Sequence, residues 1–211
     1  MTSARRAPRE RSRRGEGDRL RDEILDAAET LLINKADAEA VSIRAVCDAV
    51  GVTAPAIYRH FADKDQLMLA VCERGFAQLD IALVRARAAA PDPVEALLAC
   101  AKAYVDFALE NPGQYRMLFM HKGDLHDDRE DADWLEAPGM NAFHGLVNAV
   151  QQAVDADLLK ASDAQAVAVM LWTSVHGVAS LRLSMPDFPW PPLEEQLKQL
   201  NDVLIAGLAR D

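Results

Sequence analysis

The residues from Thr53 to Lys64 concentrate polar chemistry on one short segment of the chain. Phenol, imidazole and ammonium groups bind phosphate oxygens, whereas small apolar side chains contact the methyl group of thymine. We therefore expect Tyr58, His60 and Lys64 to contact the phosphate backbone of duplex DNA. Arg44 can reach either the backbone or a base edge. The further outward-facing candidates are Thr53, Ala54, Pro55, Ala56 and Arg59.

Two helices joined by a tight turn must position those side chains. Ser42 is a good N-cap for a helix that stops at Gly51, where the chain turns and needs a positive φ. A short helix follows Thr53 and ends near Arg59. Cys47 falls where the two helices cross closely, and the pair shares a small core made of Ile43, Val46, Val50, Val52, Ile57 and Phe61. The segment is thus predicted to be a helix-turn-helix whose second helix enters a major groove.

Residues 42–67 resemble the N-terminal signature of the TetR (tetracycline-repressor) family, a G-V-S-x-x-x-[LI]-Y-x-H-F-x-x-K-x-x-L run. The matching positions are Gly51, Val52, Thr53, Ile57, Tyr58, His60, Phe61, Lys64 and Leu67, with Thr in the place of Ser. The resemblance implies that the short helix is the recognition helix and that Tyr58, His60 and Lys64 hold the DNA backbone. Cys47 departs from the usual alanine and slightly enlarges a tight contact.

Charge is distributed unevenly along the 211 residues, whose net charge is −10. Residues 1–74 hold 13 Lys and Arg against 13 Asp and Glu, whereas residues 75–211 hold 10 against 20. Residues 1–14 alone contain six Arg and one Glu. The N-terminal part therefore approaches a polyanion more easily. We interpret residues 1–17 as a disordered Arg-rich arm, which either lies along DNA or serves only as a solvated tail.

Apolar residues recur at spacings of three and four almost throughout, which predicts an all-α protein of about nine helices. The three N-terminal helices form the helix-turn-helix domain, residues 18–65, and residues 66–211 form a C-terminal helical bundle that binds ligand and dimerises. The first helix is expected from about Asp18 to Asn34. Later helices open at Asp63, at Asp92-Pro93, near Tyr115, near Met140, at a capping box beginning with Ser162, and at Leu193.

Aromatic and methionine side chains in four helices of the C-terminal half are the candidates for a small-molecule site. Such sites lie between helices and are lined mainly by aromatic and flexible apolar side chains. For each single residue, packing in the core is the competing interpretation. The candidates are Tyr104, Phe107, Met117, Phe119, Met120, Met140, Phe143, Trp172 and His176. The acidic balance of this half favours an apolar or aromatic ligand over a strongly anionic one.

Two shorter stretches, Asn111 to Phe119 and Trp172-x-x-x-His176-Gly177, resemble the TetR branch whose ligand domain is named for Trp, His and Gly. The helix from Ala164 to Leu181 is apolar on nearly every side, so one subunit can hardly bury it alone. The last helix adds a leucine seam formed by Leu193, Leu197, Leu200 and Leu204. We expect a homodimer through the eighth and ninth helices, as the resemblance also implies; packing of the seam within one subunit is the alternative.

Other classes of protein have less support. No nucleophile elbow, phosphate-binding glycine loop or H-E-x-x-H pair is present, so we expect no enzyme and no cofactor. The loop from His121 to Asp128 collects possible metal ligands, which keeps a metal-dependent helical enzyme as a remote alternative, although we assign no metal site. Three cysteines without C-x-x-C spacing, the absence of a signal peptide and the shortness of the uninterrupted apolar runs fit a cytoplasmic protein away from membranes.

These features together predict a TetR-type transcriptional regulator that binds operator DNA. By the family resemblance we expect a repressor that a small apolar or aromatic effector releases from its operator. The main alternative is an architectural protein that binds DNA without sequence preference through its arginine-rich end.

Overall fold

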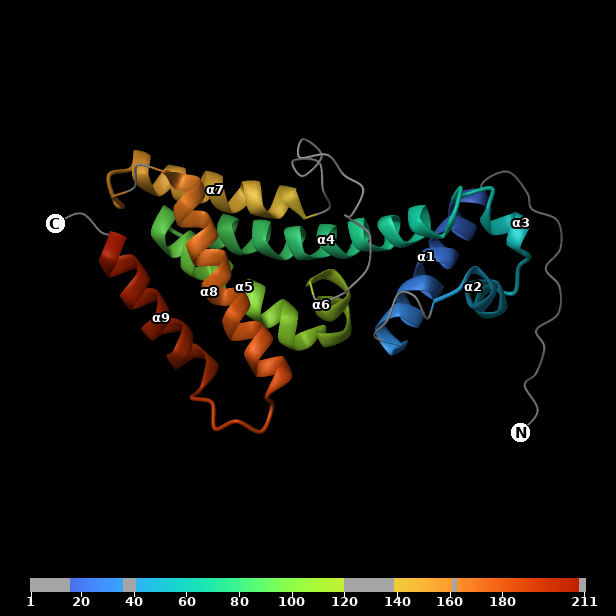
Figure 1. Ribbon diagram of the computed structural model, residues 1–211. Helices are drawn as coiled ribbons and strands as arrows, with labels where there is room; N and C mark the ends of the chain where they lie inside the picture. The colour runs from blue at the N-terminus through green and yellow to red at the C-terminus, as the bar shows by residue number, and fades with distance from the viewer. Residues whose placement is uncertain (1–15, 36–40, 120–138, 161–162, 209–211) are drawn as a thin grey trace. The chain divides into compact units, whose positions relative to one another are not determined.

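The computed structural model describes residues 16–35, 41–119, 139–160 and 163–208. Within these ranges the chain folds into nine α-helices and no strand, so the prediction of an all-α protein is confirmed (Figure 1). The helices are α1 (Glu16–Lys35), α2 (Ile43–Val50), α3 (Ala54–Ile57), α4 (Lys64–Ala89), α5 (Pro93–Glu110), α6 (Pro112–Phe119), α7 (Met140–Asp155), α8 (Ala164–Ser184) and α9 (Leu193–Leu208).

The chain divides into two compact units. The first unit contains residues up to Gly75 together with the segment that starts at Gly113, and the second contains Phe76–Pro112 and the C-terminal helices. The long helix α4 therefore gives its first half to the first unit and its second half to the second unit. Helix α6 belongs to the first unit, although it follows α5 of the second unit along the chain.

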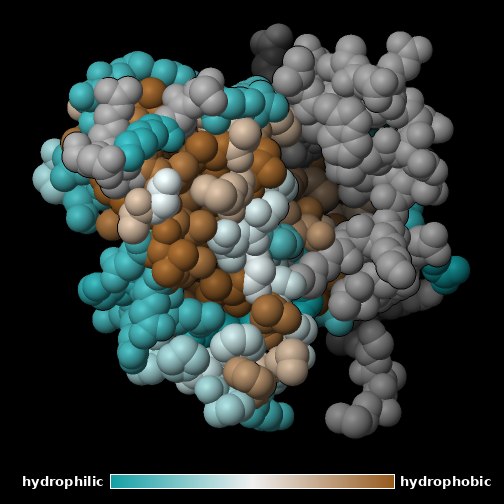
Figure 2. Space-filling view, turned by 60° about the vertical axis from the view of Figure 1, so that its left-hand side comes forward, coloured by the Kyte–Doolittle hydropathy of each residue, from teal (hydrophilic) through white to brown (hydrophobic). Residues whose placement is uncertain are grey.

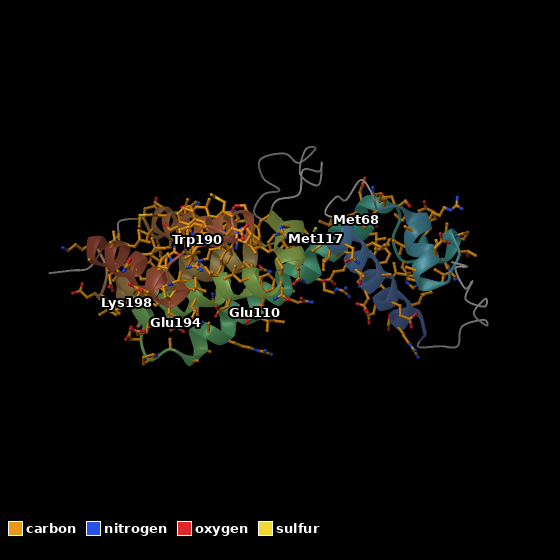
Figure 3. All side chains as sticks on the ribbon, turned by 90° about the horizontal axis from the view of Figure 1, so that it is seen from below. Met68, Glu110, Met117, Trp190, Glu194 and Lys198 are labelled. Carbon is orange, nitrogen blue, oxygen red and sulfur yellow. The ribbon has the colours of Figure 1, made fainter. Side chains whose placement is uncertain are left out.

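The core of the first unit joins α1, α2, α3, the start of α4 and α6. Ile24, Val46, Ile57, Leu67 and Val71 are fully buried in it. Two methionines from distant parts of the sequence, Met68 of α4 and Met117 of α6, belong to the same core (Figure 3). The core predicted for the helix-turn-helix is confirmed, because Val46, Ile57 and Phe61 are buried and the partly buried Ile43, Val50 and Val52 pack against them.

A polar network ties α6 to α1 and α4 inside the first unit. The Arg74 guanidinium donates to Asp26 over 2.7 Å and also to Glu29, and the buried Gln114 amide donates to the other Glu29 oxygen over 3.0 Å. Burial alone would lower the pKa of Arg74, but its hydrogen bonds to Glu29 and Asp26 outweigh that effect and raise it. Arg74 therefore stays charged and holds α4 against α1.

The start of α6 differs from the prediction. The sequence predicts a helix that opens near Tyr115, but α6 begins three residues earlier, at Pro112. Proline is well tolerated in the first helical turn, where its missing amide hydrogen would have no partner. Gly113 thus lies inside the helix, where a Cβ atom would come within 2.4 Å of Ile33 Cγ2 in α1. Glycine permits this close approach of α6 to α1.

In the second unit α5 packs against both α7 and α8, α7 packs against α8, and α9 packs against α5. The buried residues Leu97, Val150, Leu159 and Ala168 form the centre of one core cluster. The Asp92 cap of α5 forms as predicted, with its carboxylate accepting from Val94 and Glu95. The cap predicted at Ser162 is replaced by Asp163, whose carboxylate accepts from Ala166 N at 3.0 Å. Ser162 lies outside the described residues.

Helix α8 is the one described helix that is long and apolar enough, by length and composition alone, to cross a membrane. The sequence analysis considered only uninterrupted apolar runs and so expected no such segment. Core helices of soluble proteins pass the same test. Only 28% of the most apolar stretch of α8 is buried, and a single helix of this kind is weak evidence for a membrane span. Its buried residues are Ala168, Val175, Val178 and Ala179, and α8 packs on α5 and α7, so it is a partly buried helix of the bundle.

Candidate DNA-binding and ligand-binding sites

Local hydrogen bonds shape the turn between α2 and α3 as the sequence predicts. The Ser42 hydroxyl accepts from Ala45 N at 3.2 Å and caps α2. Gly51 has φ 79° and ψ 37°, and both its amide and that of Val52 donate to the Cys47 carbonyl. A side chain at Gly51 would be strained at this positive φ. The turn thus fixes the direction in which α3 leaves α2.

Helix α3 directs a mixed set of side chains outward. Thr53 precedes it, and the Thr53 hydroxyl makes no capping hydrogen bond. Thr53, Pro55, Tyr58 and Arg59 are exposed, with 51% of the Tyr58 surface accessible. The expected outward orientation of Ala56 is wrong: only 8% of its surface is exposed, because it lies beside Ile57 on the inner side of this short helix.

Three cations on this surface carry charge that the described residues do not neutralise. In the described part of the chain, Arg44, Arg59 and Lys64 form no ion pair with a carboxylate, whereas Arg19 and Arg74 do. Arg44 and Arg59 are exposed, and Ala54, His60 and Lys64 are half-buried. At the start of α4 the Asp63 carboxylate accepts from Gln66 N, as the predicted capping box requires. The Gln66 side chain accepts from Ala62 N, one residue before the cap, instead of from Asp63 N.

Aromatic and polar side chains meet in the second unit around Tyr104 of α5. The Tyr104 hydroxyl lies 2.9 Å from His176 Nδ1, and Trp172 Nε1 donates to the same hydroxyl over 3.4 Å. The ring of Phe143 lies 6.0 Å from that of Trp172 between centroids. We call Tyr104, Phe143, Trp172 and His176 the aromatic cluster. The structure thus brings together four of the nine candidates for the ligand site.

The Tyr104 hydroxyl joins the two other polar side chains of the aromatic cluster. It accepts from Trp172 Nε1 and shares a hydrogen bond with His176 Nδ1, in which the donor is set by the tautomer of His176. Burial lowers the pKa of His176 below its usual value of 6.5. The cluster is therefore neutral at neutral pH and presents aromatic surface with a few polar atoms, as expected of a site for an apolar ligand.

The C-terminal helices leave apolar surface uncovered. Along α8, Ala166, Met170, Thr173 and Leu181 are exposed at spacings typical of one helix face, and Gly177 lies on that face with no atom within 4 Å of a Cβ built there. Figure 2, which is turned toward the side of α7, α8 and α9, shows apolar residues gathered there in one continuous area. We call these five residues of α8 the outer stripe.

The leucine seam of α9 is only partly what the sequence suggests. Leu197 is 4% exposed, so it packs within its own subunit, and Leu193, Leu200 and Leu204 are half-buried. For Leu197 the alternative of packing within one subunit is therefore confirmed, whereas dimerisation through the eighth and ninth helices stays a prediction. The uncovered apolar residue of α9 is Val203, which is 73% exposed.

Sequence models of two protein families match the chain. The model for bacterial regulatory proteins of the tetR family matches residues 24–71, and that for the tetracyclin repressor-like C-terminal domain matches residues 97–207. The second match alone covers more than half of the chain. The chain belongs to the TetR family. This confirms the resemblance found in the helix-turn-helix, whereas the branch named for Trp, His and Gly remains a prediction.

Individual TetR-family relatives agree with this assignment. The HTH-type transcriptional activator FasR from Mycolicibacterium smegmatis is 30% identical over 102 residues, which is 48% of this chain and 46% of FasR. The chain thus matches less than half the length of that relative. Among solved structures, a protein of unknown function from Rhodococcus sp. RHA1 is 29% identical with a TM-score of 0.77, covering 90% of this chain and 96% of that one. A TetR family transcription regulator from Marinobacter aquaeolei VT8, 17% identical with a TM-score of 0.71, covers 94% and 100% and shows the same fold.

The other ligand candidates of this TetR protein lie in different places. Phe107 is buried in α5 and Met140 is half-buried at the start of α7. Met117 is part of the core of the first unit, where Phe119 also lies, 5.1 Å from the ring of Tyr115. Met120 and the possible metal-binding loop from His121 to Asp128 lie outside the described residues. Within the described ranges no group of three potential metal ligands is found.

The sequence analysis missed two arginines with unusual surroundings. The Arg21 guanidinium of α1 lies 5.2 Å from the centre of the Phe61 ring, next to His60. In the second unit the Arg87 guanidinium lies against Gly145 of α7 and Cys100 of α5. The partners of Arg21 and Gly145 are 40 and 58 residues away in the sequence, so no local spacing signals these contacts.

Proposed function

We propose that this TetR-family regulator binds a palindromic operator as a homodimer and represses the adjacent promoter until a small effector releases it. The observation that carries the proposal is the outward surface of the helix-turn-helix. Around the four-residue helix α3, the described residues combine a threonine hydroxyl that makes no capping hydrogen bond, an exposed phenol and arginines without carboxylate partners. A short recognition helix that is packed against a buried core can enter the major groove of DNA.

The geometry supports separate roles for the two sides of the DNA-binding surface. Tyr58, His60 and Lys64 are proposed to bind phosphates, which position the protein before bases are read. Thr53, Ala54 and Pro55, at the start of α3, are proposed to face base edges, where Ala54 and Pro55 contact thymine methyl groups. The buried Ala56 is removed from the proposed contacts. Arg44 and Arg59 complete the set.

Arg21 is added to this surface. Its guanidinium carbon lies over the Phe61 ring, 5.2 Å from the centroid, and its N–H groups are proposed to bind a phosphate. Arg21 is exposed and has no carboxylate partner in the described part of the chain. We propose that it extends the backbone contact from the helix-turn-helix to α1.

The aromatic cluster is the proposed effector site. Its hydrogen-bonded Tyr104 and His176 can orient a ligand, while Phe143 and Trp172 supply apolar contact area. Phe107 and Met140 are proposed as further lining residues in the second unit. The effector is expected to be largely apolar or aromatic.

Dimerisation is proposed through α8 and α9. Large apolar side chains are exposed on both helices: Met170 and Leu181 in the outer stripe, and Val203 on α9. A large exposed apolar patch on a soluble protein marks an interaction surface. Gly177 lets a second helix approach closely, since no atom of the described residues lies within 4 Å of a Cβ built there. A two-fold pairing of these faces buries them in an isologous four-helix bundle.

Regulation follows from two states of the dimer. Two recognition helices must lie about one turn of B-DNA apart, roughly 34–36 Å, or a simple multiple. An effector that prefers a dimer with a different distance between the recognition helices lowers the affinity for the operator. The size of the effect is set by the ratio of the effector's affinities for the two forms of the dimer. Because α4 belongs to both units, we propose that it transmits this change. The protein is proposed to act in the cytoplasm as a regulator without catalytic activity.

A gel-shift titration with DNA from the region upstream of its own gene tests the proposal. The protein should bind this duplex with at least about a thousandfold preference over unrelated DNA of equal length. Expression of a reporter under the same promoter should increase on deletion of the gene if the protein is a repressor. It should decrease if the protein is an activator, which is what FasR is named. Binding that is equally strong to any DNA would overturn the proposal in favour of an architectural protein.

A further inference from the structure

Arg87, in the last turn of α4, is a half-buried cation for which the described residues supply no counter-charge. In the described residues no carboxylate forms an ion pair with it. The acceptor contacted by its guanidinium is the buried Cys100 thiol, with Nη1 at 3.9 Å from Sγ. A thiol is a weak acceptor and offers no compensating charge. Burial of a charge is costly unless the charge is paired, so a carboxylate that reaches this guanidinium would be favoured.

The position of the guanidinium is defined by the surrounding helices. A Cβ atom on Gly145 of α7 would lie 2.8 Å from Nη2 and 3.0 Å from Nη1, so the group rests against the backbone of α7. Cys100 Sγ in turn lies 3.8 Å from the Leu83 carbonyl of α4. Burial raises the pKa of the Cys100 thiol and the nearby Arg87 charge opposes that rise. The guanidinium is therefore held between α4, α5 and α7 inside the second unit.

The aromatic cluster begins one helical turn away. Cys100 and Tyr104 are four residues apart on α5, so they share a face and are separated by about 6 Å along the axis. Both are buried. A ligand lying along this face of α5 would place one end at Arg87 and its body beside Tyr104. The distance suits a small amphipathic molecule with one acidic group.

We propose that Arg87 binds the carboxylate of the effector, and that the effector is therefore an apolar or aromatic monocarboxylic acid. The inference rests on the proposed effector site at the aromatic cluster and adds the anionic end of the ligand. The flat guanidinium binds a carboxylate through two parallel hydrogen bonds. The acid excess of residues 75–211 disfavours a polyanion, but one carboxylate matches the Arg87 guanidinium, which the described residues leave without an ion pair. The effector thus carries a single negative charge, which the composition of this half did not suggest.

The full-length protein is titrated with carboxylic acids and with their methyl esters. Each acid and its ester have similar apolar surfaces, but only the acid is charged at neutral pH. The probes are decanoic, dodecanoic and 2-naphthoic acid, below their micelle concentrations, with binding measured by calorimetry. At least one acid should bind about tenfold more tightly than its ester. Failure of every acid to bind more tightly than its ester overturns the proposal without any variant.

Substitutions then assign the preference to Arg87. Arg87→Gln should remove the acid preference while leaving ester affinity unchanged, and Arg87→Lys should retain part of it. Arg85→Gln, two residues earlier on the same helix and exposed, is the matched control and should bind like the unaltered protein. An acid preference that persists in Arg87→Gln, or that is lost equally in Arg85→Gln, overturns the proposal.

Operator binding separates this inference from the proposed function. Gel shifts without any probe establish whether the protein recognises its promoter. If it does, and neutral esters release it as well as acids do, the effector site stands and the role of Arg87 is wrong. If the promoter is not recognised at all, the proposed function fails, whatever the acid titrations show.

Discussion

The proposed phosphate contact of the Tyr58 hydroxyl can be tested without changing the charge of the protein. Half of its surface is accessible, and its ring belongs to no buried core. Tyr58→Phe should weaken operator binding by about 1–2 kcal/mol, because a hydrogen bond to a charged phosphate is lost. The dependence of affinity on salt should stay the same, since no charge changes. Fluorescence anisotropy at several salt concentrations measures both quantities.

Lys64→Ala is the comparison for Tyr58→Phe. Loss of one phosphate-bound cation should reduce the slope of log affinity against log salt by about one and weaken binding to all duplexes alike. Arg21→Ala should behave in the same way if its guanidinium reaches the backbone. A variant of Tyr58 that alters the slope, or one of Arg21 that leaves affinity unchanged, contradicts the assigned contact.

His176 connects the aromatic cluster to pH. Its pKa is lowered by burial, so the unfolded chain takes up a proton at higher pH than the native protein does. Its contribution to stability is therefore fully present above about pH 6.5 and decreases as the pH falls below that value. Urea unfolding at pH 7.5 and 5.5 should show a steeper loss for the unaltered protein than for His176→Gln.

The size of this difference is limited by partial exposure of His176. One proton accounts for at most about 1.4 kcal/mol per pH unit, and solvent screening keeps the value well below that ceiling. Comparing the two proteins cancels the titration of the many surface carboxylates. Equal pH slopes would show that the protonation of His176 does not affect folding.

At the scale of elements, the contact of α6 with α1 depends on a missing side chain. Gly113→Ala places a methyl group 2.4 Å from Ile33 Cγ2, so the two helices must separate or a rotamer must change. Overpacking of this kind costs about 1–3 kcal/mol. Chemical denaturation followed by circular dichroism should record that loss in the free energy of unfolding.

Ile33 supplies the control for Gly113. Because its side chain is partly exposed, Ile33→Ala alone should cost little. Combined with Gly113→Ala, it should restore most of the lost stability, which gives a favourable coupling energy in the double-mutant cycle. Strict additivity of the two substitutions would mean that the close approach does not govern the stability of this unit.

Element boundaries were predictable where the signal is local. Ser42, Gly51, Asp63 and Asp92 act through hydrogen bonds or φ angles within four residues, and each performs the expected role. The errors arose where two local signals compete. Asp163 caps α8 although Ser162 precedes it, because adjacent residues with capping side chains cannot be ranked by sequence alone.

The candidate sites were predictable in composition more than in geometry. Trp172 and His176 share a helix face by their spacing, but the hydrogen bond from Tyr104 joins residues 72 positions apart. Ala56 was misjudged because a four-residue helix shows too little periodicity to separate its inner from its outer side. The surroundings of Arg87 depend on three helices and have no counterpart in any local pattern.

At the scale of the whole molecule, the outer stripe of α8 should control oligomerisation. Met170→Glu places a charge in the centre of the apolar face and should convert the protein from a dimer to a monomer, as measured by analytical ultracentrifugation. Operator affinity should then fall at least about a hundredfold, since a monomer contacts one half-site. The melting temperature of the unaltered protein should rise with its concentration, and that of Met170→Glu should not.

Asn148→Glu is the control, because it adds the same charge at an exposed position on α7 and should remain dimeric. A dimer that survives Met170→Glu with full operator affinity would place the interface away from α8.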